Sequence, residues 1–365
     1  MHQTPQPYNG RWWFICSCIL YVTSLVLFCS FVLVLLLRAI LYPKTVPGPG
    51  AKQPSVSAEE ISISACIPIS ILTLIDQTIY IASDANWNGT GHGFMLFCYV
   101  AWWVVVVWIL ITTQATYVNL TRTSAISPDT LPPACIIPGV GVVTAAVVGA
   151  SVVTYGYDVS PQLAVPVIIV GYILIGWGIF WALFVYATFF IRSLNAGWLP
   201  PEKIPTLLFL VGPPGQTAGA LMALGSAAQK HFPNYGDDSP IFTLMGGQSF
   251  AATSALFALI FLGLYALWLI YSIYGILEAA FAGKIKSFTF TWWGTIFPTA
   301  TGNLAFVFLA DGFNSQAFAV LSCIWLVVLF IDYFACWIFT IIGIVKGDLL
   351  DGREEDEKEA RQKSD

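Results

Sequence analysis

The side chains best suited to hold an ion follow the proline residues that interrupt the apolar runs of this sequence. Pro213 and Pro214 stand in the stretch GPPGQT, and Gln216 and Thr217 come directly behind them. Proline lacks a backbone N–H and clashes with the preceding turn, so a helix kinks or breaks there. The N–H groups that begin the next half-helix carry partial positive charge, and amide and hydroxyl side chains add donors. This chemistry predicts weak binding of an anion.

A second proline, Pro298, is followed by Thr299 and Thr301 in the same way. Weak, distributed donors suit the passage of an ion, because an ion that binds too tightly does not leave. No Lys or Arg lies clearly inside the proline-containing runs, so no full positive charge is expected there. The alternative role for each of these polar side chains is a hydrogen bond between helices.

Two aspartates, Asp76 and Asp332, stand inside apolar runs. An ionised carboxylate beside an anion path repels the permeating ion, and in a low-dielectric environment it tends to take up a proton. Asp76 therefore either faces away from the path or serves as a proton site. Asp332 lies midway along the last long run, where a hydrogen bond that supports packing is the expected role.

Cysteine and histidine residues indicate no metal or haem site. All eight cysteines fall inside apolar runs, where a free thiol packs as a small hydrophobic group. The histidines, His2, His92 and His231, lie outside these runs, whereas a metalloenzyme or haem protein in the membrane usually needs His at membrane depth. We expect no catalytic or metal-binding residue, no cofactor, no enzymatic activity and no nucleic-acid partner.

The composition places these residues in membrane-spanning helices. The chain has 365 residues, of which 57% are hydrophobic and 10% charged, and a bilayer is crossed by about 20 apolar residues. This predicts an all-α polytopic membrane protein, with a leader at 1–11, a transmembrane domain at 12–345 and a charged tail at 346–365. The predicted spans are 12–42, 61–83, 93–118, 134–155, 163–191, 206–228, 249–277, 288–310 and 316–345, nine in all.

The predicted spans alternate between short ones that contain proline and long ones that do not. The span at 163 has only Pro166, which we place in its first turn, where proline is tolerated. In lipid, interrupted helices persist only where protein or a water-filled cavity surrounds them. The repeat therefore predicts inner helices around one polar path and long helices outside, although proline can also kink a helix for packing alone. The residues predicted at the breaks are Pro68, Pro138, Gly212, Pro213, Pro214, Gly215 and Pro298.

Basic residues indicate the orientation, because they favour the cytoplasmic ends of spans. If the N-terminus is outside, 13 of the 15 Lys and Arg residues lie on the cytoplasmic side, and Arg11 and Lys230 lie outside. We predict a multi-pass protein of the plasma membrane with an outer N-terminus and a cytoplasmic C-terminus.

Three passages resemble the tellurite-resistance/dicarboxylate transporter family, which includes fungal malic acid transporters, sulfite efflux pumps and plant slow anion channels. They are VGPPGQ at 211–216, WWGTIFP at 292–298 and LRAILYPK at 37–44. The resemblance extends in register from about 12 to 345, and the first two passages together are fairly specific.

The resemblance implies helical hairpins in a quasi-fivefold arrangement around a central pore, ten helices in all, and a homotrimer. The pore of this family is closed by a phenylalanine, and Phe297 is its counterpart by position; the alternative is an ordinary packing phenylalanine. The chain departs from the pattern because it has nine predicted spans, and 12–42 resembles the second helix of the family. A truncated or divergent N-terminus is expected, unless another chain supplies the first inner helix.

The function that these observations predict is a transporter or channel for small organic anions, most of all a C4-dicarboxylate such as malate. Sulfite efflux is an alternative, because GPxGQ at 212–216 resembles the sulfite pumps equally. The third possibility is a non-transporting or truncated member of the family.

Overall fold

The structure, a computed structural model, describes residues 11–42, 58–84, 91–123, 131–236, 239–285 and 287–347. The described residues form helices and connecting turns, without a strand. Most of the predicted leader and of the charged tail lies outside the described residues.

The long predicted spans are uninterrupted helices of 31 to 38 residues. They are α1 (Arg11–Leu41), α4 (Gly91–Thr123), α6 (Pro161–Ala196), α8 (Leu244–Phe281) and α10 (Gln316–Lys346). The expected place of Pro166 is wrong by one turn, because α6 already begins at Pro161 and continues through Pro166.

The short predicted spans are interrupted, and each changes from one helical segment to another. We call them the inner helices: α2 (Ala58–Ile63) with α3 (Cys66–Asp84), η3 (Pro133–Ile136) with α5 (Ile137–Tyr155), η4 (Pro201–Val211) with α7 (Gly212–His231), and η6 (Phe290–Thr295) with α9 (Ile296–Gly312). A short 3-10 segment, η5 (Phe232–Asn234), follows α7. Proline stands in the first turn of each second segment, at Pro68, Pro138, Pro213 and Pro298. Proline suits that position, because the first N–H groups of a helix have no intrahelical acceptor.

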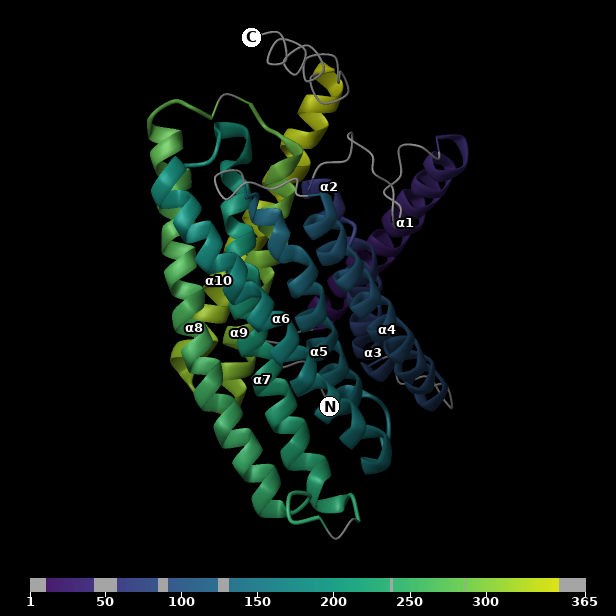
Figure 1. Cartoon of the computed structure of the whole chain (residues 1–365). Coiled ribbons are helices and arrows are strands. Elements are labelled where there is room, and N and C mark those ends of the chain that lie inside the picture. The colour runs from purple at the N-terminus through teal and green to yellow at the C-terminus, as the bar shows by residue number, and fades with distance from the viewer. Residues whose placement is uncertain are drawn as a thin grey trace.

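Eight of the nine predicted spans have the length and apolar composition of membrane-crossing helices in the part of the chain that the structure describes. The remaining predicted span, 288–310, is divided between η6 and α9, and α9 has only 17 residues. It nevertheless runs alongside α7 and α10 between the two ends of the bundle (Figure 1).

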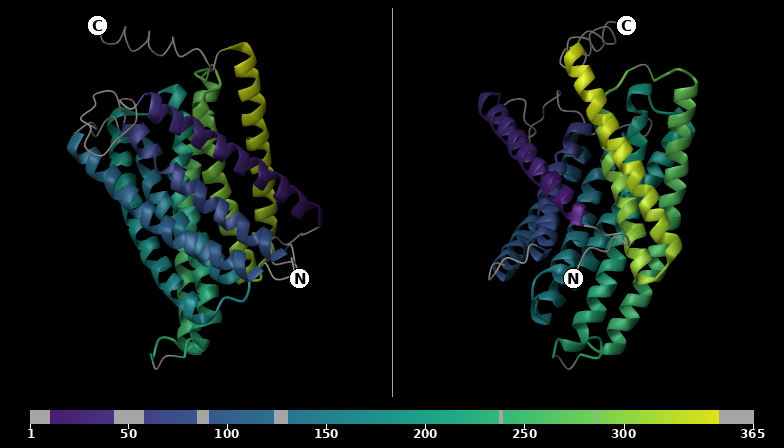
Figure 2. Two further views of the ribbon diagram at one scale, coloured as in Figure 1. Left: turned by 90° about the vertical axis from the view of Figure 1, so that its right-hand side faces the viewer. Right: turned by 180° about the vertical axis from the view of Figure 1, so that it is seen from behind.

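The inner helices form an arc in the order α3, α5, α7, α9, in which each packs against the next. The long helices cover the outside of the arc: α4 on α3 and α5, α6 on α5 and α7, α8 on α7, and α10 on α9. Nearly every residue of α5 and α7 is buried as a result. No comparable packing joins the described residues of α3 and α9, so the arc is open there. Helices α1 and α10 lie on the two sides of this opening (Figure 2).

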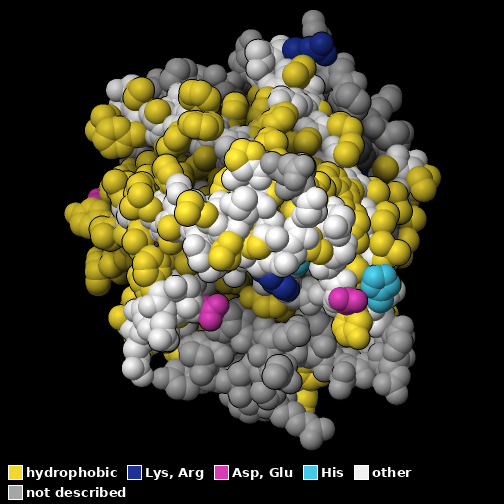
Figure 3. Space-filling view, turned by 90° about the horizontal axis from the view of Figure 1, so that it is seen from below, with side chains coloured by type: hydrophobic (Ala, Val, Ile, Leu, Met, Phe, Trp, Pro, Cys, Tyr) yellow, Lys and Arg dark blue, Asp and Glu magenta, His cyan; other side chains and the backbone are white. Residues whose placement is uncertain are grey.

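The two ends of the bundle differ in charge. We call the end that carries Arg38, Arg122, Arg192, Lys203, Lys284 and Lys346 the basic end. Seen from the opposite end, the described surface consists mostly of hydrophobic and uncharged polar groups, with few charged side chains (Figure 3). The fivefold arrangement and the orientation in the membrane remain predictions.

Candidate anion path

The breaks in the inner helices lie at one level of the bundle. Gly212 begins α7, and a Cβ placed on it would lie 3.9 Å from both Pro298 of α9 and Val140 of α5. A Cβ placed on Gly141 of α5 would lie 3.1 Å from Ile69 of α3. Each contact joins residues next to a break, so the breaks of all the inner helices are neighbours in space.

Side chains of the outer helices cap carbonyl groups at these breaks. The Leu210 carbonyl would pair with the N–H that Pro214 lacks, and it accepts instead from the Tyr186 hydroxyl of α6 at 2.7 Å. Ser272 of α8 donates to the Leu207 carbonyl at 3.0 Å. Thr113 of α4, Trp181 of α6 and Trp325 of α10 donate to the carbonyls of Pro138, Cys135 and Thr299.

This capping corrects one step of the sequence argument. We expected carbonyls freed by proline to need protein or a water-filled cavity around them. The Tyr186 hydroxyl satisfies one of them, the Leu210 carbonyl, within protein, and the other hydroxyl and indole donors of the outer helices bond to further carbonyls near the breaks. The breaks alone therefore do not demonstrate a wet path, and the side chains next to them must carry that argument.

Gln216 and Thr217 lie just beyond the break of α7, and both are buried. The Gln216 amide donates to the Thr144 hydroxyl of α5 at 2.8 Å, so it joins the two most enclosed helices. The Gln216 carbonyl oxygen and the Thr217 hydroxyl have no hydrogen-bond partner within the described part of the chain. The Thr217 hydroxyl can therefore donate to an anion, whereas the Gln216 oxygen can only accept a hydrogen bond. Thr144 was not found from the sequence, because only packing places it opposite Gln216.

Thr299 and Thr301 are engaged within their own helix. The Thr299 hydroxyl donates to the Thr295 carbonyl at 2.8 Å, and the Thr301 hydroxyl donates to the Pro298 carbonyl at 2.7 Å. Hydroxyl groups in helices commonly bond back to the preceding turn in this way. Their hydrogens are therefore less available to an anion than that of Thr217.

Tyr265 of α8 reaches the level of the breaks, although the sequence placed α8 in the outer wall. Its ring lies against Gly215, and its hydroxyl occupies the place where a side chain at position 302 would stand. The hydroxyl lies beside the Trp325 indole, but that N–H donates to the Thr299 carbonyl, and the hydroxyl itself is unpartnered in the described ranges. Nothing in the sequence distinguishes Tyr265 from the other aromatic residues of this span.

Phe297 is half-buried and packs against the hydrophobic core. Ala300 and Asn303, which follow Phe297 at intervals of three residues on α9, are partly exposed like Phe297. The Asn303 side-chain oxygen is buried without a partner in the described part of the chain. The position is compatible with a gate, and the gate remains a prediction.

Asp76 faces α5, inside the bundle. Its carboxyl group contacts Ser151, which also lies 3.4 Å from the Tyr80 hydroxyl. The rings of Tyr80 and Tyr155 are 4.9 Å apart and close this group of side chains. One carboxyl oxygen, Oδ1, is buried without a partner among the described residues. The described ion pairs are Arg38 with Glu60 and Lys203 with Glu59, so neither involves Asp76.

Asp332 has the packing role predicted for it. The Thr295 hydroxyl donates to Asp332 Oδ2 at 2.7 Å, and the Cys336 thiol lies 3.9 Å from Oδ1. The hydrogen bond from Thr295 attaches α10 to the end of η6, and the contact with Cys336 lies within α10. Within the described ranges no group of three or more His, Cys, Asp and Glu side chains gathers to hold a metal ion.

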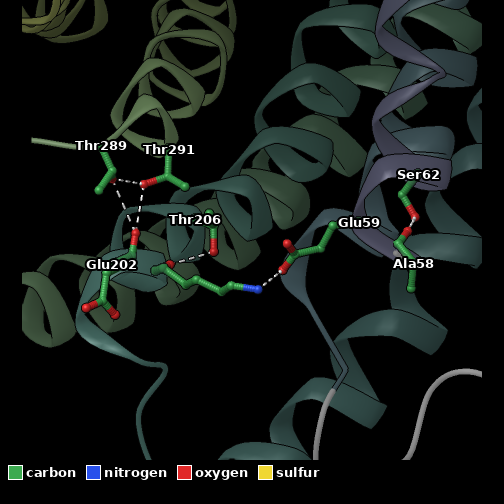
Figure 4. Close-up of polar contacts among 8 residues, drawn as sticks. Ala58, Glu59, Ser62, Glu202, Thr206, Thr289 and Thr291 are labelled. Carbon is green, nitrogen blue, oxygen red and sulfur yellow. Dashed lines mark hydrogen bonds and ion pairs between the residues drawn. The ribbon is translucent and has the colours of Figure 1, made fainter. Parts of the chain in front are cut away.

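At the basic end, polar contacts join the first segments of three inner helices (Figure 4). Lys203 of η4 forms an ion pair with Glu59 of α2, with 2.8 Å between Nζ and Oε1. The Glu202 carbonyl accepts from Thr291 at 2.9 Å and from Thr289 at 3.4 Å, which connects η4 to η6. At this end the first segments of these inner helices are therefore joined by hydrogen bonds and one exposed ion pair.

These features define a helical, multi-pass membrane protein whose interrupted inner helices meet at one level and carry uncharged hydrogen-bonding groups there. Compared with known proteins, residues 1–341 match the SLAC1 family, described as voltage-dependent anion channel. The chain belongs to the SLAC1 family of anion transporters and channels, and the resemblance indicated by its motifs is confirmed.

Individual relatives are distant and have two different names. A sulfite efflux pump of Arthroderma otae is 26% identical over 305 residues, which cover 83% of this chain and 76% of that protein. A sulfite efflux pump of Trichophyton rubrum is 24% identical over 319 residues, covering 85% and 80%. A malic acid transport protein of Schizosaccharomyces pombe is 24% identical over 341 residues, covering 93% and 74%.

Proposed function

We propose that this protein carries small organic anions, C4-dicarboxylates such as malate, across the plasma membrane along the inner side of the arc. The observation that supports this most is the meeting of the interrupted helices at one level, next to the unpartnered Thr217 hydroxyl and the Gln216 amide. Uncharged donors and half-helix N-termini attract an anion without holding it tightly. The malic acid transport protein, whose match extends over 93% of this chain, supports the same substrate class.

Sulfite is the second candidate substrate, and the relatives named sulfite efflux pumps favour it. Purified protein in proteoliposomes, given labelled malate or sulfite in parallel, distinguishes the two. We expect faster flux of malate than of sulfite over protein-free vesicles. The reverse order would assign the protein to sulfite, and flux of neither would support a non-transporting family member.

Within this function we assign two roles. Phe297 closes the path at the level of the breaks, and Asp76 binds a proton that moves together with the anion. The contact of Asp76 with Ser151 supports the second role, because the ion pairs among the described residues do not include Asp76 and an isolated ionised carboxylate is costly in a membrane interior. We also propose a homotrimer, for which chemical cross-linking of the purified protein is the direct test.

A further inference from the structure

The ion pair between Lys203 and Glu59 joins inner helices that are not neighbours in the arc. Glu59 belongs to α2 and Lys203 to η4, while η3 lies between them and packs against both. The pair therefore connects the first and third members of the arc at the basic end, and Figure 4 shows Glu59 at the dashed line that marks it. Lys203 precedes Gln216 and Thr217 along the same inner helix, so it lies nearer the basic end than they do.

The pair is exposed enough to be exchanged. The Lys203 and Glu59 side chains are 48% and 32% exposed, and exposed ion pairs contribute little to stability. A dicarboxylate or sulfite ion offers oxygen atoms of the same charge as the Glu59 carboxylate. Replacing one such acceptor by another at Lys203 therefore costs little, and it releases Glu59.

The backbone of Lys203 is fixed while its side chain is free to exchange. The Lys203 carbonyl accepts from Thr206 at 2.7 Å, and its N–H donates to the Pro200 carbonyl at 2.9 Å. The neighbouring Glu202 carbonyl is held by Thr289 and Thr291. Only the long side chain needs to move for the ammonium to change partner.

A second ion pair provides a comparison within the same helix. Glu60, the next residue of α2, pairs with Arg38 of α1 at 3.2 Å, with side chains 38% and 46% exposed. The two pairs match in exposure and in residue type on α2. They differ in direction, because Glu60 points to α1, outside the arc, and Glu59 points to another inner helix.

We propose that Lys203 is an anion-binding residue at the basic end of the path, and that Glu59 is its exchangeable counter-ion, displaced by the arriving substrate. This rests on the proposed function, because it assumes that anions pass along the arc. It adds a charged site at the entrance to the uncharged site at the breaks.

The test is the concentration dependence of malate and sulfite flux when the anion is supplied from the basic end. We expect Lys203→Gln to raise KM about fivefold, with a smaller change in the maximal rate. Lys203→Arg, which keeps the positive charge, should have a KM close to that of the unmodified protein. Glu59→Gln frees Lys203 and should lower KM roughly twofold, and Glu60→Gln should leave it unchanged. High ionic strength should diminish the difference between Glu59→Gln and the unmodified protein.

The proposal is overturned if Glu59→Gln and Glu60→Gln shift KM equally, or if Lys203→Gln leaves KM unchanged while the protein still carries the anion. Size-exclusion profiles of each variant identify those that fail to fold. If Lys203→Gln fails to fold, the KM of Lys203→Arg still tests whether a positive charge at this position is sufficient. Absence of any flux by the unmodified protein would instead reject the proposed function.

Discussion

At the scale of single residues, the two aspartates inside the predicted spans, Asp76 and Asp332, can be compared directly. Asp76 has an unpartnered buried oxygen near Tyr80 and Tyr155, whereas Asp332 accepts from Thr295. We expect Asp76→Asn to abolish the stimulation of anion flux by a pH gradient, while flux down the anion gradient persists. One pH unit provides about 1.4 kcal/mol per proton, enough for about tenfold accumulation.

Asp332→Asn is the control for Asp76→Asn, since it removes a carboxylate of the outer helix and should leave the pH dependence intact. The measurement is uptake into proteoliposomes with and without an imposed pH gradient. Gradient-stimulated uptake by Asp76→Asn at the unmodified level would exclude Asp76 as the proton site.

Substitution of Phe297 tests whether this residue closes the path. Removing its ring should widen the path at the level of the breaks, so Phe297→Ala is expected to raise anion conductance severalfold in planar bilayers. Phe290, which is exposed and lies in η6 before the break, provides the control, because Phe290→Ala should not change conductance. Unchanged conductance in Phe297→Ala, in a protein that conducts, would return Phe297 to an ordinary packing role.

The residues of the candidate site were predictable where their position depends only on neighbouring residues in the sequence. Pro213 and Pro214 fix the break, so the sequence correctly placed Gln216 and Thr217 beside it. Thr299 and Thr301 follow Pro298 in the same way, yet their hydroxyls bond back within α9, a choice between local and ligand contacts that sequence does not reveal. Tyr265 comes from another helix, and only tertiary packing brings it there.

At the scale of the helices, the capping of broken segments by outer side chains is an energetic requirement. The Leu210 carbonyl depends on the Tyr186 hydroxyl because Pro214 cannot donate to it. We expect Tyr186→Phe to leave that buried carbonyl unpaired and to lower stability by about 1–3 kcal/mol. Thermal unfolding in detergent measures this.

The control for this helix-capping prediction is Tyr274→Phe, which removes a hydroxyl from an exposed tyrosine of α8 and should leave the midpoint unchanged. Equal midpoints for Tyr186→Phe and the unmodified protein would mean that the carbonyl finds another donor.

The alternation of helices was predictable from hydropathy and proline, because both act within about 20 residues. The interrupted spans and the long ones appear where those patterns placed them. The 3-10 segments before Pro138, Pro213 and Pro298 were not predictable. The same is true of the donors from Thr113 and Trp181, because they depend on which helices become neighbours. The same holds for the short α9, whose span is divided by a break.

At the scale of the whole molecule, the arc has an edge at α3 and an edge at α9. An inner group of helices that is open on one side can still form a path if protein or lipid closes it. The family match extends over residues 1–341 and so includes the inner helices on both sides of the opening. The repeat of the proline-containing spans allows the inner helices to be counted from the sequence. Only the structure shows that α3 and α9 are not packed together over their described residues.

The charge difference between the ends of the bundle decides which side of the membrane Lys203 faces. Positive residues favour the cytoplasm, so we expect the basic end there.

Exposed turns at Gly236 and Gly283 lie at opposite ends, and a Cβ on either would meet no atom within 4 Å. Such turns tolerate insertions. An epitope inserted after Gly236 should bind antibody on intact cells, and one after Gly283 only after permeabilisation. The reverse pattern would place Lys203 and Glu59 outside, and the anion that displaces Glu59 would then arrive from the medium.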